Sequence, residues 1–277
     1  MLKFTKMHGL GNDFIIFDST KQELLNHSEL AKKVCDRHFG IGADGMIVVE
    51  CSSNSDIKMI FYNADGSQAP MCGNGIRCFA KYAFDKRLVK NREFDVETLA
   101  GIMRPRIILS EEKVSFVEVN LGRAYFSSDI IHANTDKEKI LNESIEIDGD
   151  IFKISAVMVG SVHAVIFVDD LDKIDINTIG RKIENHQLFP NKINVNFCKI
   201  IDDANLKVLT WERGVGQTLA CGTGAASTAV ISNILHNTSK KVNIHLLGGT
   251  VQIEQRNNEV FMTGPAEVIC EGVYYEK

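Results

Sequence analysis

The sequence predicts an α/β protein built from two similar halves, and three observations support this fold class. Short segments recur in the same order at an offset of 149 or 150 residues. Most of the other segments are brief and rich in β-branched residues, as strands are. Two longer runs with apolar residues at helical spacing each follow a cysteine, Cys72 in one run and Cys221 in the other. Each half is therefore expected to be α+β, with one central helix that begins at a cysteine.

The prediction of an internal duplication depends on three pairs of segments. These pairs are 3–18 with 153–169, 30–45 with 179–194, and 62–75 with 211–224. In the third pair, an aromatic residue lies ten positions before the cysteine and a glutamine lies four positions before it. Three pairs of segments whose offsets differ by only one residue are hard to obtain by chance. The sequence therefore predicts that a half-sized unit has been copied within the chain.

The expected elements follow in chain order. The strands are 14–18, 45–50, 58–63, 106–109, 115–119, 164–168, 208–211, 242–249, 250–254 and 259–264. The two long helices are 75–89 and 224–237, and a short helix followed by a loop is expected in each of 30–45 and 179–194. The polar stretch 127–150 is expected to carry the connection between the halves, and the strand after Gly264 to return to the first half. The predicted domains are 1–121 with 265–277, and 122–264, facing each other across one cleft.

Composition and charge limit the classes of function. The chain has 277 residues, of which 44% are hydrophobic and 24% are charged, as in a globular protein with a sizeable core. A net charge of −5 without any Lys/Arg-rich block argues against a nucleic-acid partner. The sequence shows neither a signal peptide nor an apolar run of the roughly 18 residues that a membrane helix needs. A cytoplasmic protein with no membrane partner is therefore expected.

The cysteines are scattered, and none forms a Cys-x-x-Cys motif. There are seven: Cys35, Cys51, Cys72, Cys78, Cys198, Cys221 and Cys270. An odd number in a chain without a signal peptide predicts free thiols. Cys72 and Cys78 are six positions apart, which is a poor spacing for zinc, so no metal site is expected.

A cysteine at a helix start has a chemical consequence. The first turn leaves backbone N–H groups unpaired, and the macrodipole makes that end positive. A thiolate is stabilised there, so the pKa of such a thiol falls from about 8.5 toward neutral. The following Gly-Asn-Gly (73–75) and Gly-Thr-Gly (222–224) let the backbone turn freely, and their N–H groups can hold a carboxylate.

Three interpretations of the repeated cysteine motif compete. Small residues after a cysteine also allow close packing, but packing alone does not explain two copies in register. A redox pair is weakened by the absence of Cys-x-x-Cys. Two facing thiols suit inversion of a stereocentre, because one removes a proton from carbon and the other delivers a proton to the opposite face. No P-loop, dinucleotide fingerprint or pyridoxal-phosphate lysine appears, so a racemase or epimerase without a cofactor is predicted.

Five ordered motifs closely resemble those of diaminopimelate epimerase: "KMHGLGNDF", "FYNADGS", "MCGNGIRC", "INVNF" and "ERGVGQTLACGTGA". The resemblance covers residues 3–273. It implies that each half is a mixed barrel-like sheet around a central helix, with the active site in the cleft between the halves. It also implies interconversion of LL- and meso-diaminopimelate without a cofactor, in lysine and peptidoglycan biosynthesis, by a possible homodimer.

The resemblance implies site residues for a small-molecule substrate with two amino-acid heads. Cys72 and Cys221 would be the acid/base pair. The reacting head would be bound by Asn12, Gly73, Asn74, Gly222 and Thr223. The distal head would be held by Asn63, Asn194 and Arg213, and Glu212 would contact an ammonium group. His163 and Glu212 match positions thought to tune the thiols. Simpler roles remain open: Asn63 as a turn residue, Glu212 and Arg213 as a surface ion pair, His163 as a core histidine and Asn12 as a loop residue.

The chain departs from the family at "GSVH" (160–163), where Gly-Asn-Pro-His is usual. Ser161 replaces an asparagine expected to contact the distal head, and Val162 replaces a proline that stiffens the turn. Cys270 stands where many members have a tyrosine in the dimer contact. The same chemistry on lanthionine or histidine is therefore an alternative.

Two further alternatives are a non-catalytic amino-acid-binding protein and the related isomerase branch without paired cysteines. The presence of both cysteines argues against each of them. Arg213 favours a two-headed substrate, because its planar guanidinium matches a second carboxylate.

Overall fold

The computed structural model describes residues 1–276. The chain divides into two compact units, Met1–Asn120 with Thr263–Lys277 (unit 1) and Leu121–Met262 (unit 2). Among residues 1–276, no helix is long and apolar enough to cross a membrane.

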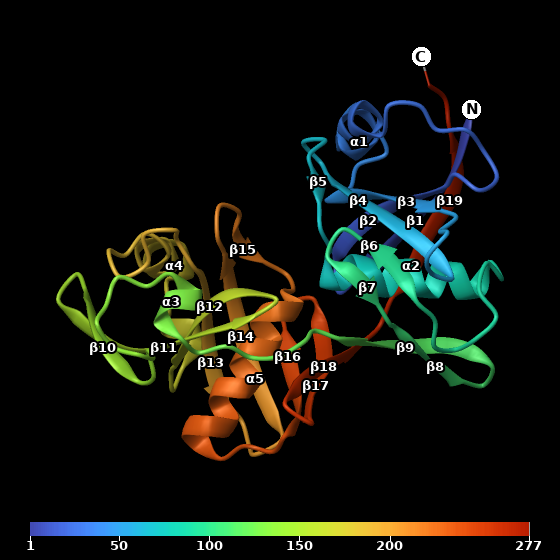
Figure 1. Ribbon diagram of the computed structural model, residues 1–277. Coiled ribbons are helices and arrows are strands. Elements are labelled where there is room, and N and C mark those ends of the chain that lie inside the picture. The colour runs from blue at the N-terminus through green and yellow to red at the C-terminus, as the bar shows by residue number, and fades with distance from the viewer. Residues whose placement is uncertain (277) are drawn as a thin grey trace. The chain divides into compact units, whose positions relative to one another are not determined.

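Unit 1 contains a sheet with the strand order β19-β1-β2-β3-β4-β6-β7, to which β5 adds beside β4 (Figure 1). The strands are β1 (Leu2–Gly9), β2 (Asn12–Asp18), β3 (Gly45–Glu50), β4 (Ile57–Asn63), β5 (Gln68–Ala69), β6 (Val96–Thr98), β7 (Gly101–Met103) and β19 (Glu267–Tyr274). A hairpin of β8 (Arg106–Ser110) and β9 (Lys113–Asn120) follows. The helices are α1 (His27–Cys35) and α2 (Gly73–Asp85).

The two helices of unit 1 pack in different ways. The amphipathic α1 is capped by Asn26, whose side chain accepts from the Glu29 N–H, and it buries Leu30 and Val34 in a core formed with strand residues. In contrast, α2 contacts β1, β2, β3, β4, β8 and β9, so it is the central helix of the unit. It ends at Asp85, four residues earlier than predicted, because Arg87 adopts a left-handed conformation (φ 57°).

Unit 2 has the strand order β10-β11-β12-β13-β14-β16-β17-β18, and β15 adds beside β14. The strands are β10 (Glu143–Ile147), β11 (Asp150–Val159), β12 (Ser161–Phe167), β13 (Asn194–Ile200), β14 (Asn205–Glu212), β15 (Gly216–Thr218), β16 (Lys241–Leu246), β17 (Gly249–Arg256) and β18 (Glu259–Gly264). The helices are α3 (Ser128–Ile131), the 3-10 turn η1 (Leu171–Lys173), α4 (Ile176–Glu184) and α5 (Gly222–His236).

The central helix of unit 2 is α5. It contacts β11, β12, β13, β14, β16 and β17. Its small residues, including Ala225, Ala226 and Ala229, are buried, so sheet strands can lie close on several of its sides. A buried cluster of mostly β-branched residues from β11, β12, β13 and α4 fills the rest of the unit.

The strand directions repeat between the units. The pairs β2–β3 and β12–β13 are parallel, and so are β4–β6 and β14–β16. Antiparallel pairs also recur: β1–β2 in unit 1 matches β11–β12 in unit 2, and β4–β5 matches β14–β15. The predicted α/β fold with an internal duplication is confirmed, and each predicted strand overlaps an observed one.

One prediction about the chain path is wrong. The stretch 127–150 was expected to connect the halves, but it contains α3 and β10 and belongs to unit 2. β10 pairs with β11 as β19 pairs with β1 in unit 1. The stretch is polar because β10 is an edge strand, where alternate residues face water.

Candidate functional site

The candidate site of unit 1 lies where α2 begins. Cys72 has an extended backbone (φ −130°, ψ 125°), and its carbonyl accepts from the Ile76 N–H at 2.8 Å. A Cβ on Gly75 would lie 3.3 Å from the Cys72 Cβ and 3.5 Å from the Ile47 Cδ1. A larger residue at position 75 would therefore touch both the cysteine and a side chain of β3. The half-buried thiol is then at the positive end of the helix dipole.

Asn12, the first residue of β2, orients an oxygen toward this thiol. Its Nδ2 donates to Asp44 Oδ2 at 2.7 Å, which leaves Oδ1 on the other side. That oxygen accepts from Asn74 Nδ2 at 3.2 Å and from Cys72 Sγ at 3.7 Å. The predicted residues Asn12, Cys72 and Asn74 therefore lie together, and Cys72 is a hydrogen-bond donor in this arrangement.

A row of alternating charges fixes Asp44. Arg37 Nη2 lies 2.7 Å from Asp44 Oδ1 and 2.8 Å from Asp13 Oδ1, and Lys6 Nζ lies 3.0 Å from Asp13 Oδ2. Burial raises the pKa of Asp13, but hydrogen bonds from Arg37 and Lys6 outweigh this effect and lower it overall. The contact with Arg37 fixes the Asp44 carboxylate, and its hydrogen bond from Asn12 Nδ2 in turn holds the Asn12 amide in one orientation.

The candidate site of unit 2 has the same backbone. Cys221 precedes α5 with an extended conformation (φ −123°, ψ 111°), and its carbonyl accepts from the Ala225 N–H at 2.9 Å. A Cβ on Gly224 would lie 2.4 Å from Asn196 Oδ1, so a larger residue is excluded unless Asn196 moves. Cys221 is 7% exposed and is thus more buried than Cys72.

Three predicted residues cluster beside Cys221. Thr223 Oγ1 lies 3.5 Å from Cys221 Sγ, 2.9 Å from His163 Nε2 and 3.1 Å from Ser161 Oγ. Ser161 Oγ lies 2.9 Å from the same ring nitrogen. Ser161, which replaces the usual asparagine, is thus part of a hydroxyl–imidazole cluster next to the thiol.

His163 is neutral in this cluster. Its side chain is fully buried, and burial lowers its pKa to about 3, with a smaller effect from the charge of Arg213. A neutral imidazole has one donor and one acceptor nitrogen. The ring can therefore orient hydroxyl hydrogens around Cys221 without adding a positive charge.

The residues predicted for the distal head lie at loop and strand ends. In unit 1, Asn63 is exposed at the end of β4, and its Nδ2 donates to Ser67 Oγ at 3.0 Å. In unit 2, Asn194 is buried: its Nδ2 donates to Val162 O at 2.8 Å and its Oδ1 accepts from the Arg213 N–H at 2.9 Å. The Asn194 amide thus supports local backbone, and the Asn63 amide contacts a side chain of its own turn. Each nitrogen used keeps a second hydrogen, and the Asn194 oxygen keeps a second lone pair.

The two charged residues predicted to bind the substrate, Glu212 and Arg213, lie in the β14–β15 hairpin. Arg213 is exposed, and its Nη1 donates to Asn191 O at 3.0 Å. Glu212 Oε1 accepts from Thr218 Oγ1 at 2.6 Å. Their backbone is held by Asn194 on one side and by β15 on the other.

Sequence reasoning missed four residues that shape these sites: Asp44 and Arg77 in unit 1, and Asn196 and Thr210 in unit 2. Asn196 and Thr210 carry polar groups in otherwise apolar strands, with exposed fractions of 0% and 2%. A buried polar residue must find a partner, so their place in β13 and β14 beside a predicted site was a usable signal. Nothing in the sequence links Asp44 to Asn12.

The remaining cysteines differ from Cys72 and Cys221. Burial raises the pKa of Cys35 and of Cys78 to about 12, and it also raises that of Cys198. Cys51 and Cys270 are exposed. Within residues 1–276, no group of three or more His, Cys, Asp or Glu side chains is arranged to hold a metal ion.

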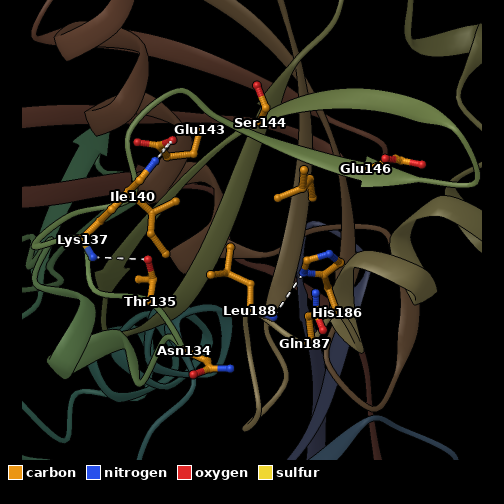
Figure 2. Close-up of a pocket in the computed structure, with 11 residues that line it drawn as sticks. Asn134, Thr135, Lys137, Ile140, Glu143, Ser144, Glu146, His186, Gln187 and Leu188 are labelled. Atoms are coloured by element: carbon orange, nitrogen blue, oxygen red, sulfur yellow. Dashed lines mark hydrogen bonds and ion pairs between the residues drawn. The ribbon is translucent and has the colours of Figure 1, made fainter.

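A surface cavity of about 540 Å³ in unit 2 contains none of the predicted site residues (Figure 2). It is lined by residues of 134–146 and 186–188, among them the ion-paired Lys137 and Glu143. His186 Nδ1 in its wall accepts from the Leu188 N–H. The cavity contains neither Cys72 nor Cys221, so it is not the place where the predicted proton transfer at carbon would occur.

The comparisons with known proteins agree over both units. The family model for diaminopimelate epimerase matches residues 4–127 and 155–269. A diaminopimelate epimerase of Caldanaerobacter subterraneus subsp. tengcongensis is 46% identical over 272 residues, covering 98% of each chain. One of Alkaliphilus metalliredigens is 47% identical, covering 99% of this chain and 97% of that protein.

Solved structures share the fold at lower identity. A Bacillus anthracis phenazine biosynthesis protein of the PhzF family gives a TM-score of 0.71 at 14% identity and covers 98% of each chain. A probable proline racemase from Agrobacterium radiobacter gives a TM-score of 0.72 at 12% identity, covering all of this chain and 94% of that one. At these identities, the likeness concerns the duplicated fold alone.

Proposed function

Since the chain belongs to the diaminopimelate epimerase family, we propose that it interconverts LL- and meso-diaminopimelate by moving α-protons at Cys72 and Cys221. The observation that carries this proposal is that each of the duplicated units starts its central helix at a cysteine. A binding protein would need no thiol at either position. Two thiols at helix starts suit an isomerase that uses them as acid and base.

The reaction exchanges one proton for another at the α-carbon. The thiolate of one cysteine removes the α-proton, and the C–H electron pair passes into the adjacent carboxylate as an enediolate-like carbanion. The thiol of the other cysteine then protonates the opposite face, so the stereocentre inverts and the two sulfurs exchange protonation states. The reverse reaction uses the same two groups in exchanged roles.

The carbanion must be stabilised because an α-proton next to a carboxylate is very weakly acidic. We assign this task to backbone N–H groups at the two helix starts, those of Gly73 and Asn74 and those of Gly222 and Thr223. Helix N-termini bind carboxylates and stabilise developing negative charge. Asn12 has an amide beside Cys72 and would contact the reacting head.

The distal head is assigned to polar groups outside the helix starts. Arg213 would bind its carboxylate with the planar guanidinium fork, and Glu212 would contact an ammonium group of the substrate. Asn63 and Asn194 retain hydrogen-bonding capacity beyond their local contacts and would complete the recognition. Ser161 contacts Thr223 and His163, so its hydroxyl would act on the substrate as part of that hydrogen-bonded cluster.

We further propose a cytoplasmic homodimer that requires no cofactor and no nucleic acid. The seven cysteines are free, as in reducing compartments, and β19 is an edge strand with the exposed apolar residues Val268, Ile269 and Val273. Light scattering at micromolar concentration tests the assembly, and a monomer mass contradicts a dimer.

Exchange of α-protons in deuterated water tests the function. The protein is incubated separately with LL-diaminopimelate, lanthionine, histidine, glutamate and lysine, and proton NMR follows each α-position. Exchange and inversion are expected with diaminopimelate, and not with the single-headed amino acids. Exchange with lanthionine or histidine but not with diaminopimelate would overturn the proposed substrate, and no exchange at all would overturn the chemistry.

A further inference from the structure

A buried chain of hydrogen bonds runs from the sheet of unit 2 to Cys221. It starts at Asn196 in β13, passes through His163 in β12 and ends at Thr223 in the first turn of α5. Asn196 and His163 are both 0% exposed. Water therefore does not compete for the bond between Asn196 and His163, and its direction is set by the protein.

The orientation of the Asn196 amide follows from a neighbouring carbonyl. Nδ2 lies 3.1 Å from Ala164 O, which can only accept, and Oδ1 lies 2.9 Å from Thr210 Oγ1. If the amide were turned over, its oxygen would face the oxygen of Ala164 at hydrogen-bond distance. The arrangement with Nδ2 toward Ala164 is therefore the one that satisfies every group.

The orientation of Asn196 determines the tautomer of His163. The same Nδ2 lies 3.1 Å from His163 Nδ1. Because Nδ2 only donates, Nδ1 must be the unprotonated ring nitrogen, and a neutral ring then carries its proton on Nε2. Nε2–H is a donor to the hydroxyls of Ser161 and Thr223, each 2.9 Å away.

This tautomer leaves the hydroxyl hydrogen of Thr223 available. In the other tautomer, Nε2 would be an acceptor and would compete for that hydrogen. With Nε2–H donating, the Thr223 hydroxyl can donate to Cys221 Sγ at 3.5 Å. A hydrogen bond donated to sulfur favours the thiolate over the thiol.

We infer that Asn196 is a positioning residue: it holds His163 in the Nε2–H tautomer, which makes Thr223 a hydrogen-bond donor that supports the Cys221 thiolate. The catalytic meaning of this chain depends on the proposed function. In the adjoining β14–β15 hairpin, Arg213 lowers the pKa of His163, and Glu212 accepts from Thr218. The first turn of α5 has no acidic residue that would oppose a thiolate.

Two measurements without substrate test the inference on the full chain. Nitrogen NMR of ¹⁵N-histidine protein, with His163 assigned from His163→Gln, should show Nε2 protonated and Nδ1 unprotonated at pH 7. Alkylation of Cys221 by iodoacetamide, resolved by mass spectrometry of its peptide, should be about tenfold slower at pH 7 in Asn196→Leu. The protonated nitrogen of His163 should also shift toward Nδ1 in that variant.

Thr228→Val is the matched control. Thr228 is buried in α5 and donates to Gly224 O at 2.9 Å. The variant therefore also removes a buried hydrogen bond, but not one of those that link Asn196 to Thr223. It should leave the His163 tautomer and the Cys221 rate unchanged.

A protonated Nδ1 in the unmutated protein overturns the inference, and this result does not require the variant to fold. An unchanged Cys221 rate in a folded Asn196→Leu also overturns it. The expected tautomer and rates without any exchange of diaminopimelate would contradict the proposed function and leave the hydrogen-bond chain intact.

Discussion

The helix starts of unit 1 and unit 2 share a backbone but differ in what supports the thiol. In both, a polar residue two positions after the cysteine contacts the first residue of a strand, Asn74 with Asn12 and Thr223 with Ser161. Ser161 therefore occupies in unit 2 the position of Asn12 in unit 1. The replacement at "GSVH" exchanges an amide for a hydroxyl within this repeated contact.

The strand residues that lie next to the two helix starts differ more strongly in polarity. Strand register matches three pairs of residues: Phe14 with His163, Ile47 with Asn196, and Phe61 with Thr210. In unit 1 these positions are apolar, and the two phenylalanines pack edge to face with ring centroids 5.9 Å apart. In unit 2 they form the hydrogen-bond chain that reaches Cys221.

Unit 1 instead buries a full charge. Arg77 in α2 is 0% exposed, and it donates to Gly73 O and to Pro265 O, each at 3.2 Å. Burial lowers the pKa of Arg77, whereas ionised Cys78 and Cys72 would raise it. The matching position in unit 2 is Ala226. The duplication thus copied the backbone that presents each thiol. Later divergence placed a buried charge, Arg77, near the thiol of unit 1 and a neutral series of hydrogen bonds near the thiol of unit 2.

The largest effect is expected from removing either thiol. Cys72→Ala and Cys221→Ala should each lower turnover by about 10²-fold to 10⁴-fold, because each removes an acid/base group. Circular dichroism should be unchanged, since each substitution removes one atom at a helix start. Near-normal turnover in either variant would break the equivalence of the two sites.

Arg213→Ala should produce the next largest effect and sharpen the difference between the hairpins. Unit 2 carries Glu212 and Arg213 where unit 1 carries Asn63 and Ala64. Losing a charge-assisted pair with a carboxylate costs about 1.5–3 kcal/mol, so KM for diaminopimelate should rise about tenfold to a hundredfold. Because Arg213 is assigned to the head that does not react, kcat should change less than KM. An unchanged KM for diaminopimelate in Arg213→Ala would contradict the assignment to the distal head.

His163→Gln should change how stability depends on pH. The pKa of His163 is about 3 when folded and about 6.5 when unfolded, so the unfolded chain binds the extra proton as pH falls between these values. The protein should therefore lose about 2 kcal/mol of unfolding free energy between pH 7 and pH 5 through this residue.

The glutamine variant should lack this part of the pH dependence, as measured by urea unfolding at the two pH values. His38→Gln, at an exposed position of unit 1, is the control and should keep the slope of the unmutated protein. The same slope in all three proteins would mean that His163 is not held neutral.

The sequence predicted the features that repeat, and it missed those that depend on unit-specific contacts. The duplication, the central helices and the cysteines at their starts follow from periodicity and from a constant offset. The end of α2 was missed because the left-handed Arg87 has no residue signature. The three-residue strands β6 and β7 are too short for a clear alternation.

The support of the thiols was missed for a different reason. Asn196 and Asp44 act through contacts between residues 33 and 32 positions apart, His163 with Asn196 and Asn12 with Asp44. Such contacts form only once strands pair, and neither residue type has a pattern that identifies its partner. The assignment of Ser161 to the distal head was a family expectation, and its observed neighbours are His163 and Thr223.

Arg77→Met tests the charge that distinguishes unit 1 from unit 2. Methionine fills a similar volume without the charge, so iodoacetamide should alkylate Cys72 about tenfold more slowly at pH 7 while the Cys221 rate stays the same. The carbonyls of Gly73 and Pro265 lose a donor, which should cost about 1–3 kcal/mol of unfolding free energy.

Arg77→Lys separates the charge from the hydrogen bonds. Lysine keeps a cation but lacks the planar fork, so it should restore much of the Cys72 rate and little of the stability. If Cys72 reacts at the same rate in all three proteins, then the buried charge supports the fold of unit 1 alone. The contrast with the neutral hydrogen bonds beside Cys221 in unit 2 would then concern packing rather than the chemistry of the thiols.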